Sequence, residues 1–468
     1  MITFFISLIV LILGFLIYGK FVETVFKPST KPTPAITHND GVDYIPMPTW
    51  KVFMIQLLNI AGLGPIFGAI AGALWGPVVY FWIVIGTIFS GAVHDYLSGM
   101  ISLRHNGESI SEIVGIYLGD TMKIVMRIFS VVLLVLVGTV FMTGPALLLA
   151  KLTPDSLNVT FWLIVVLIYY FLATLLPIDK IIGKIYPLFG ACLIIMAVGV
   201  SSGIILGGWQ MPEMTLQNLH PKDLPIWPLM FITVACGATS GFHATQSPLM
   251  ARCMKEEKNG RVVFYGAMVA EGIIALIWAS AGIAFYETTG GLAAAIASAG
   301  PGGVVYDVSF GTLGTVGGIL AMIGVIACPI TSGDTAFRSA RYTISDWFKI
   351  DQVSYVKRLY LAVPLLAIGG ILSQMDFDII WRYFSWANQT LAMIALWTGA
   401  MYLWKQYKGS WQHLIAVVPA IFMTMVTFTY ILQAPEGFGL PTSITYPAGI
   451  IITIFWTIVY FKSTVFKK

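Results

Sequence analysis

The chemistry of this chain is concentrated in a polar stretch, residues 235–248, that lies inside a long apolar segment. It contains His243, with Ser240 and Gln246 close by. A histidine in such a setting can carry a proton or donate a hydrogen bond to an anion. The alternative is a neutral imidazole that bonds a freed backbone carbonyl and only holds the local structure open. We favour the functional role and count all three residues as candidate substrate contacts.

Two carboxylates could exchange protons with such a histidine. Asp95 follows His94 near the end of one apolar segment, where it could take a proton, pair with Arg104 or be solvated. Glu271 lies about ten residues, or roughly 15 Å of helix, inside another apolar segment. An unpaired charge there would be costly, so we predict that Glu271 couples to protons. A structural hydrogen bond is the alternative.

A second polar interruption, residues 59–68, resembles the one around His243. Glycine and proline cluster in both, as Gly62, Gly64 and Pro65 in the first and as Gly237 and Gly241 in the second. Glycine lets the backbone leave helical dihedrals and lets a ligand approach closely, although close helix packing is an alternative reason. Half-helix ends expose N–H groups that attract carboxylates and carbonyls that coordinate cations. We therefore predict a substrate site at the two interruptions.

Asn388 and Gln389 stand side by side in the middle of another apolar segment. Adjacent amides in such a helix usually face protein and bridge helices. We weight interhelical bonding above substrate contact and keep both residues as candidates for the substrate site.

Composition explains why these polar residues are exceptional. Of 468 residues, 57% are hydrophobic and only 10% are charged, with a mean hydropathy of +0.85. Soluble domains carry about 25% charged residues, so an ordinary globular protein is excluded. The four cysteines lack metal-like spacing, and neither a phosphate-binding loop nor a nucleic-acid surface is apparent. We expect an all-α polytopic membrane protein whose partners are the lipid bilayer and a small-molecule substrate, with no cofactor and no nucleic acid.

Hydrophobic runs predict about 13 transmembrane helices in a single membrane domain, residues 1–468. Residues 1–19 lack a basic start and a cleavage site, so we expect a first helix and not a signal peptide. The expected spans are 2–22, 52–73, 77–100, 122–150, 158–177, 185–208, 226–250, 262–286, 309–332, 357–374, 379–403, 413–433 and 446–463.

Lysine and arginine lie mainly in the loops of one face, which indicates orientation in the membrane. Examples on this face are Arg104, Lys123, Lys180, Lys184, Arg252, Arg338, Arg341 and Lys405, and the tail lysines Lys467 and Lys468 join them. The other face holds only Lys151, Lys222 and Arg382. We predict a multi-pass protein of the cytoplasmic membrane, with the N-terminus outside and the C-terminus in the cytoplasm.

Span counting also predicts an internal repeat. Residues 52–208 and 226–403 would each hold five helices, and an odd number makes the two sets inverted relative to each other. One extra helix (2–22) precedes the repeats, and two further helices (413–463) follow them.

Several motifs resemble those of the carbon starvation protein A family. They are Lys31-Pro-Thr-Pro-Ala35, Asp40-Gly-Val-Asp-Tyr44, Ile60-Ala-Gly-Leu-Gly-Pro65, Gly91-Ala-Val-His-Asp95, Arg104 with Gly107, Cys236-Gly-Ala-Thr-Ser-Gly-Phe-His243, Asp334-Thr-Ala-Phe-Arg338 and Ala387-Asn-Gln-Thr-Leu391. The resemblance implies uptake of peptides or pyruvate during nutrient limitation, driven by protons or another cation. It also implies the architecture of the amino acid–polyamine–organocation superfamily, a LeuT-like inverted five-plus-five repeat. The sequence departs from longer members directly after His243.

That architecture implies a possible sodium site. Sodium-coupled relatives use adjacent hydroxyls, which Thr331 and Ser332 near Cys328 would match, together with carbonyls of the first broken helix, here those of Leu58 and Ala61. Oxygen ligands suit a hard cation. The alternative, slightly favoured, is that the two hydroxyls bond back to their own helix.

The leading hypothesis is a secondary active transporter that imports pyruvate, an amino acid or a short peptide by cation-coupled alternating access and serves the response to carbon starvation. H⁺ or Na⁺ would be the coupling ion. The alternatives are a passive channel and a nutrient sensor with residual transport. An enzyme is not expected, because no metal triad or Ser–His–Asp set converges in the spans.

Overall fold

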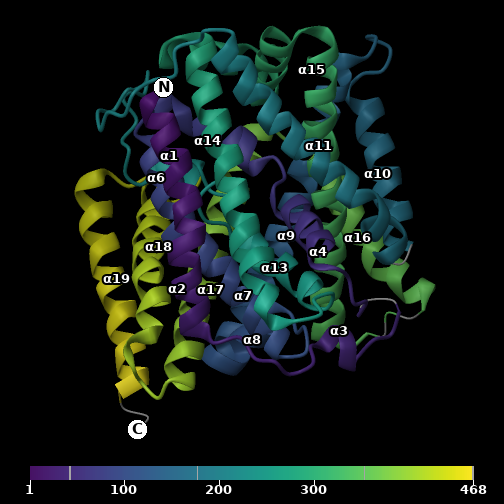
Figure 1. Cartoon of the computed structure of the whole chain (residues 1–468), viewed down its shortest axis with the longest axis vertical. Helices are drawn as coiled ribbons and strands as arrows, with labels where there is room; N and C mark the ends of the chain where they lie inside the picture. Colours follow the sequence, from purple (N-terminus) through teal and green to yellow (C-terminus); the bar gives the residue numbers. More distant parts are fainter. Residues whose placement is uncertain (42–43, 176–177, 351, 353, 466–468) are drawn as a thin grey trace.

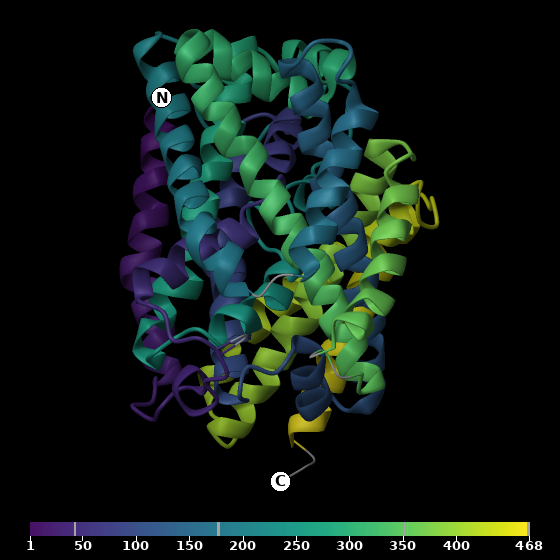
Figure 2. The same cartoon turned by 90° about the vertical axis from the view of Figure 1, so that its right-hand side faces the viewer.

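The computed structural model describes residues 1–41, 44–175, 178–350, 352 and 354–465. Within them the chain is helical, and the only strand-like pairing is an isolated bridge between Met47 and Met254. Most long helices run along one axis, and the start of α1 (Ile2–Leu13) and the end of α19 (Thr442–Val465) lie at opposite ends of the bundle (Figures 1 and 2). An odd number of membrane crossings would give this placement.

The helices are continuous or broken as their glycines and prolines allow. Up to residue 206 they are α1, η1 (Gly14–Tyr18), α2 (Gly19–Phe26), α3 (Pro34–Thr37), α4 (Thr49–Ile60), η2 (Gly64–Gly68), α5 (Ala69–Gly72), η3 (Ala73–Trp75), α6 (Val79–Gly86), η4 (Thr87–Gly91), α7 (Ala92–Arg104), α8 (Ile110–Leu118), α9 (Asp120–Leu152), α10 (Val159–Leu175) and α11 (Ile178–Leu206). After it they are α12 (Leu229–Thr233), α13 (Gly241–Ala251), η5 (Glu257–Asn259), η6 (Arg261–Tyr265), α14 (Gly266–Tyr286), α15 (Thr289–Phe348), α16 (Tyr355–Leu372), α17 (Phe377–Gln406), η7 (Trp411–His413), α18 (Leu414–Gln433) and α19.

Both predicted interruptions are real helix breaks. The first separates α4 from η2, α5 and η3, and the two halves bend by 56°. The second separates α12 from α13 by residues 234–240. Proline and glycine remove helical hydrogen bonds at both places, so neighbouring helices must supply the missing partners.

By length and apolarity, eight helices of the described residues could cross a membrane, or nine if the bent pair counts as one span. Large apolar side chains of α1, α10 and α19 are exposed along their outer faces, as a lipid environment requires; examples are Ile6, Ile168 and Ile451. The all-α membrane class is confirmed, whereas the number 13 and the repeat boundaries stay predictions.

The expected span 309–332 is too short. The helix α15 extends from Thr289 to Phe348, with non-helical dihedrals at Gly300 (φ 67°) and Gly314 (φ 65°). Only glycine adopts such a conformation without strain, so both residues redirect the helix without ending it.

The cytoplasmic end of α15 also differs from expectation. Arg338 and Arg341 were assigned to a solvated loop, but both are buried inside this helix. Arg338 donates to the carbonyl of Ala173 at 2.8 Å and Arg341 donates to that of Thr174 at 3.1 Å. These carbonyls belong to the last turn of α10, which has no helical partners for them. The side chains of Lys180 and Lys184, and the residues Lys467 and Lys468, lie outside the described part of the chain.

Candidate functional site

Helices α7, α13 and α14 bring three ionisable side chains together in the interior. The Nδ1 atom of His243 lies 2.8 Å from Oδ2 of Asp95, and its Nε2 atom lies 3.2 Å from Oε2 of Glu271. His94 contacts the other oxygen of Asp95 at 2.8 Å. All three members of this Asp95–His243–Glu271 array are fully buried. Residues expected to handle protons separately therefore form one connected group.

Glu271 is the least satisfied member of the array. Its contact with His243 lacks the alignment of a hydrogen bond, and neither carboxylate oxygen has a hydrogen-bond partner among the described residues. A buried carboxylate without partners is costly as an anion. The arrangement is therefore suited to taking up a proton or a cation at Glu271.

The position of Asp95 differs from the expected ones. It was placed near the cytoplasmic end of its span, solvated or paired with Arg104, but α7 continues nine residues beyond it to Arg104. Arg104 instead contacts Glu257 at 3.1 Å and donates to the Tyr402 hydroxyl at 2.7 Å. It also donates to the carbonyl of Lys27 at 2.7 Å. Asp95 is left free to orient His243.

The second break is held by α17. Asn388 accepts hydrogen bonds through Oδ1 from the Phe242 N–H at 2.7 Å and from the Ser240 hydroxyl at 3.2 Å. Gln389 donates to the carbonyl of Thr239 at 3.0 Å. Both amides satisfy backbone or capping groups at the start of α13, so interhelical bonding, the role we weighted higher, is the one observed.

The glycines of the two breaks allow close packing. A side chain at Gly64 would overlap Cys236, and one at Gly241 would overlap the backbone carbonyl of Asn388. A Cβ at Gly62 would meet the Phe141 ring. The carbonyl of Gly237 accepts a hydrogen bond from Thr87 at 3.1 Å. The two breaks therefore touch each other, and Pro65, which follows Gly64, lies in the same contact region.

The residues expected to bind sodium converge at the first break. Ser332 donates to the carbonyl of Leu58 at 2.8 Å and also to that of Cys328 at 3.1 Å. The Cys328 thiol contacts the carbonyl of Ala61. Thr331 bonds back to its own helix, at the carbonyl of Cys328 at 2.7 Å. Both readings of the hydroxyls are thus partly realised, since Ser332 reaches the break and Thr331 bonds within α15.

Some expected contacts are not made, and others were not foreseen. Gln246 donates to Ser339 of α15 at 3.3 Å, which directs it away from the array. Gln56 and Asn59 of α4 are fully buried, and their side-chain amides lack hydrogen-bond partners in the described residues. Their spacing of one helical turn in an otherwise apolar stretch was a usable signal, because such amides need partners or a ligand.

A sequence model of the family described as "Carbon starvation protein CstA" matches residues 1–153, 149–300 and 280–430. Among relatives, an "Uncharacterized membrane protein" of Haemophilus influenzae is 45% identical over 351 residues, covering 64% of this chain and 95% of the relative. "Peptide transporter CstA" of Bacillus subtilis is 26% identical over 542 residues, covering 91% and 88%. "Pyruvate/proton symporter BtsT" of Escherichia coli is 27% identical over 315 residues, covering 53% of this chain and 44% of the relative.

Solved structures show the same fold. MhsT in complex with L-phenylalanine superposes with a TM-score of 0.56 at 15% identity, covering 81% of this chain and 98% of that one. The Eremococcus coleocola manganese transporter gives a TM-score of 0.53 at 11% identity, covering 91% and 99%. At these identities the likeness concerns the fold alone, and it confirms the predicted LeuT-like architecture.

Proposed function

Since the chain belongs to the carbon starvation protein CstA family, we propose that it imports a small carboxylate nutrient by proton-coupled alternating access around the two helix breaks. Pyruvate, an amino acid or a short peptide are the candidate substrates. The names of relatives as a peptide transporter and as a pyruvate/proton symporter support transport. The observation that carries the proton is the buried array of Asp95, His243 and Glu271.

Charge balance explains how this array would couple. With His243 protonated and both carboxylates ionised, the array has a net charge of −1. One further proton, taken up at the unsatisfied Glu271, makes it neutral. A net charge is costly to bury, so the loaded form would rearrange between outward and inward states more easily than the empty one.

A sodium ion at the first break is the second candidate for coupling. The carbonyls of Leu58 and Ala61 and the hydroxyl of Ser332 would supply oxygen ligands. Two features favour the proton. The Ser332 hydroxyl already satisfies the carbonyl of Leu58, and the third neighbour, the Cys328 thiol, is a poor ligand for a hard cation.

The test is uptake into proteoliposomes with an imposed proton or sodium gradient. Labelled pyruvate, alanine and dialanine are offered separately. We expect accumulation of at least one of them with the proton gradient, and collapse of that accumulation by a protonophore. Downhill equilibration alone, unaffected by the protonophore, would indicate a channel and overturn the proposal.

Variants then connect the transport to the array. Glu271→Gln keeps the shape of the side chain but removes the titratable group, so gradient-driven accumulation should fall at least tenfold while exchange of internal for external substrate persists. Glu287→Gln, at the exposed end of the same helix, is the control. Full proton-driven accumulation in Glu271→Gln would remove this residue from the mechanism.

A further inference from the structure

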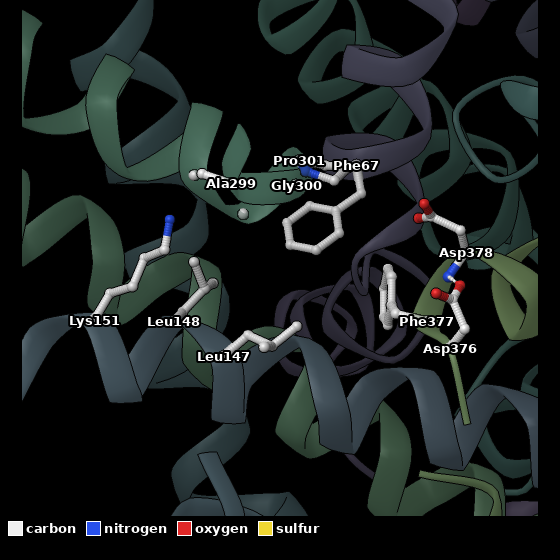
Figure 3. Close-up of a pocket in the computed structure, with 12 residues that line it drawn as sticks. Phe67, Leu147, Leu148, Lys151, Ala299, Gly300, Pro301, Asp376, Phe377 and Asp378 are labelled. Carbon is white, nitrogen blue, oxygen red and sulfur yellow. Dashed lines mark hydrogen bonds between the residues drawn. The ribbon is translucent and has the colours of Figure 1, made fainter. Parts of the chain in front are cut away.

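We propose a second ligand site, an outer capture site for zwitterionic amino acids or short peptides. It is a cavity of about 260 Å³ bounded by the end of α9, the Gly300 kink of α15 and the start of α17 (Figure 3). None of the residues predicted for substrate binding lines it. The lining residues are Phe67, Leu147, Leu148, Lys151, Ala299, Gly300, Pro301, Gly302, Gly303, Asp376, Phe377 and Asp378. The inference rests on the proposed transport function for its direction and deepens it by naming the substrate class.

The charges of the cavity are separated across its floor. Lys151 lies on one side, Asp376 and Asp378 lie on the other, and the ring of Phe67 lies between them (Figure 3). Asp376 uses Oδ1 to cap α17, accepting from the N–H groups of Asp378 at 2.9 Å and of Ile379 at 3.2 Å. The exposed Asp378 is therefore the carboxylate that is better placed to receive an ammonium group.

This pattern selects for a ligand that carries both charges. The ammonium of Lys151 would bind a carboxylate, and the carboxylate of Asp378 would bind an ammonium. A monoanion such as pyruvate would meet one cation and two anions, so the rim as a whole disfavours it. A zwitterion satisfies both sides, and the apolar floor can contact its side chain.

Glycines keep the cavity open at the kink of α15. A Cβ at Gly303 would lie 3.0 Å from the Nζ atom of Lys151. A Cβ at Gly302 would lie 3.2 Å from Leu148 and 3.5 Å from the ring of Phe67. Larger residues here would fill the space between the cation and the floor.

Aromatic rings connect this cavity to the second break and close the path between them. Phe67 contacts Trp381 with ring centroids 6.1 Å apart, and Trp381 contacts Phe384 at 5.4 Å. Phe384 contacts Phe141 at 6.1 Å, which contacts Phe242 at 6.0 Å. Phe242 directly precedes His243. A ligand in the cavity would thus wait at the far end of an aromatic column from the proton-handling array.

The proposal is tested with Lys151→Gln and Asp378→Asn in the full-length protein. Each should raise the concentration of labelled dialanine that half-saturates uptake by about tenfold, because a charge-assisted hydrogen bond is lost. The maximal rate should stay within about twofold of the wild type, because transport past the aromatic column is untouched. Lys222→Gln and Asp155→Asn, exposed positions that the sequence places on the same face, are the matched controls and should change neither quantity.

Competition experiments define the ligand class. Unlabelled dialanine should compete with labelled dialanine at least tenfold better than N-acetylalanine or alaninamide, each of which keeps only one of the two charges. The charge-swapped double variant Lys151→Asp with Asp378→Lys should recover much of the lost affinity. Wild-type half-saturation in both single variants, or equal competition by the singly charged compounds, would overturn the capture site.

Binding separates this inference from the proposed function. If no gradient drives accumulation, the proposed transport mechanism fails, yet calorimetric titration of dialanine into the purified protein still tests the cavity. Binding that weakens in Lys151→Gln but not in Lys222→Gln supports the capture site. Equal binding in both variants, or no binding to the wild type, overturns it.

Discussion

The imidazole of His243 lies 2.8 Å from the carboxylate of Asp95, although 148 residues separate the two in the chain. The same carboxylate is held on its other oxygen by His94 at 2.8 Å. Asp95 is therefore fixed on both sides, whereas Glu271 on the far side of the imidazole is not hydrogen-bonded within the described residues. This difference assigns distinct tasks to the two acids on the proposed mechanism: Asp95 orients the imidazole and Glu271 exchanges the proton.

The orienting task predicts the effect of Asp95→Asn. The amide carries no charge and turns an N–H group toward one of the two histidines, so the imidazole of His243 loses its fixed orientation. We expect proton-driven accumulation to fall at least tenfold and stability to fall by about 3–5 kcal/mol, as for other broken buried pairs. Uptake and thermal unfolding measure the two effects. Asp307→Asn, at an exposed site, is the control, and retained coupling in Asp95→Asn would refute the assignment.

Ser332→Ala distinguishes the coupling ions. Without its hydroxyl, the carbonyl of Leu58 loses a hydrogen bond of 2.8 Å, which should cost about 1 kcal/mol of stability. If protons drive transport, uptake should keep its dependence on the proton gradient. Ser309→Ala, a buried change in the same helix, is the control. A sodium requirement whose half-saturation rises in Ser332→Ala but not in Ser309→Ala would instead establish the sodium site.

The contact between the two breaks predicts that Gly64→Ala is poorly tolerated. The added methyl would overlap Cys236, and an overpacked interior typically costs about 1–3 kcal/mol. Combining it with Cys236→Gly should recover part of the loss in a thermal unfolding experiment. Gly290→Ala is the control, because the nearest atom to its added methyl is the hydroxyl of Thr288 at 3.8 Å. Equal stability of the two alanine variants would contradict the packing described.

Asn388→Ala tests how the second break is held. It would leave the Phe242 N–H and the Ser240 hydroxyl without their shared acceptor in a buried place. We expect a loss of about 1–3 kcal/mol per unsatisfied group, and a lower maximal uptake rate because the start of α13 is no longer fixed. Asn39→Ala, in an exposed loop, is the control. Unchanged unfolding of Asn388→Ala would show that the break does not depend on this amide.

A pH effect is expected outside the membrane-spanning helices, at Glu112 of α8. Burial raises the pKa of this carboxyl, but hydrogen bonds from Lys123 and Arg127 outweigh that effect and hold the pKa below its ordinary value. Because the folded-state pKa is the lower one, the stabilisation is fully present above the unfolded pKa, about 4.3, and is lost as the pH falls through the folded value.

The acid limb of stability should therefore be shallower in Glu112→Gln. The variant should unfold about 1 kcal/mol more easily at neutral pH and converge with the wild type in acid. Glu108→Gln, whose side chain is exposed, should follow the wild type at both ends of the range. Parallel curves for Glu112→Gln and the wild type across the acid range would show that the two basic partners do not stabilise the ionised carboxyl.

The helix breaks and the principal ionisable residues could be predicted because polar groups are rare in apolar sequence. His243 and Glu271 were identified from their residue types and depth alone. Their connection through Asp95 could not be, because it depends on how α7, α13 and α14 pack, which the spacing of residues does not encode. The partners of Asn388 and Gln389 were likewise visible only once α17 was placed against the second break.

Charge counting had the opposite weakness. Arg338 and Arg341 looked like loop residues because guanidinium groups usually lie in water. They are buried since the last carbonyls of α10 accept their hydrogen bonds. The outer cavity was also not foreseen, because Lys151 and Asp378 lie at helix ends, where charged residues need no special explanation.

The direct contact of Gly64 with Cys236 has a thermodynamic consequence. Because the two breaks share one packed surface, occupancy of the carbonyls of Leu58 and Ala61 and protonation of Glu271 cannot be independent events. If binding at the first break favours protonation at the second by some factor, protonation must favour that binding by the same factor. A missing side chain at one glycine is thus enough to make two distant halves of the sequence answer to a single reciprocal equilibrium.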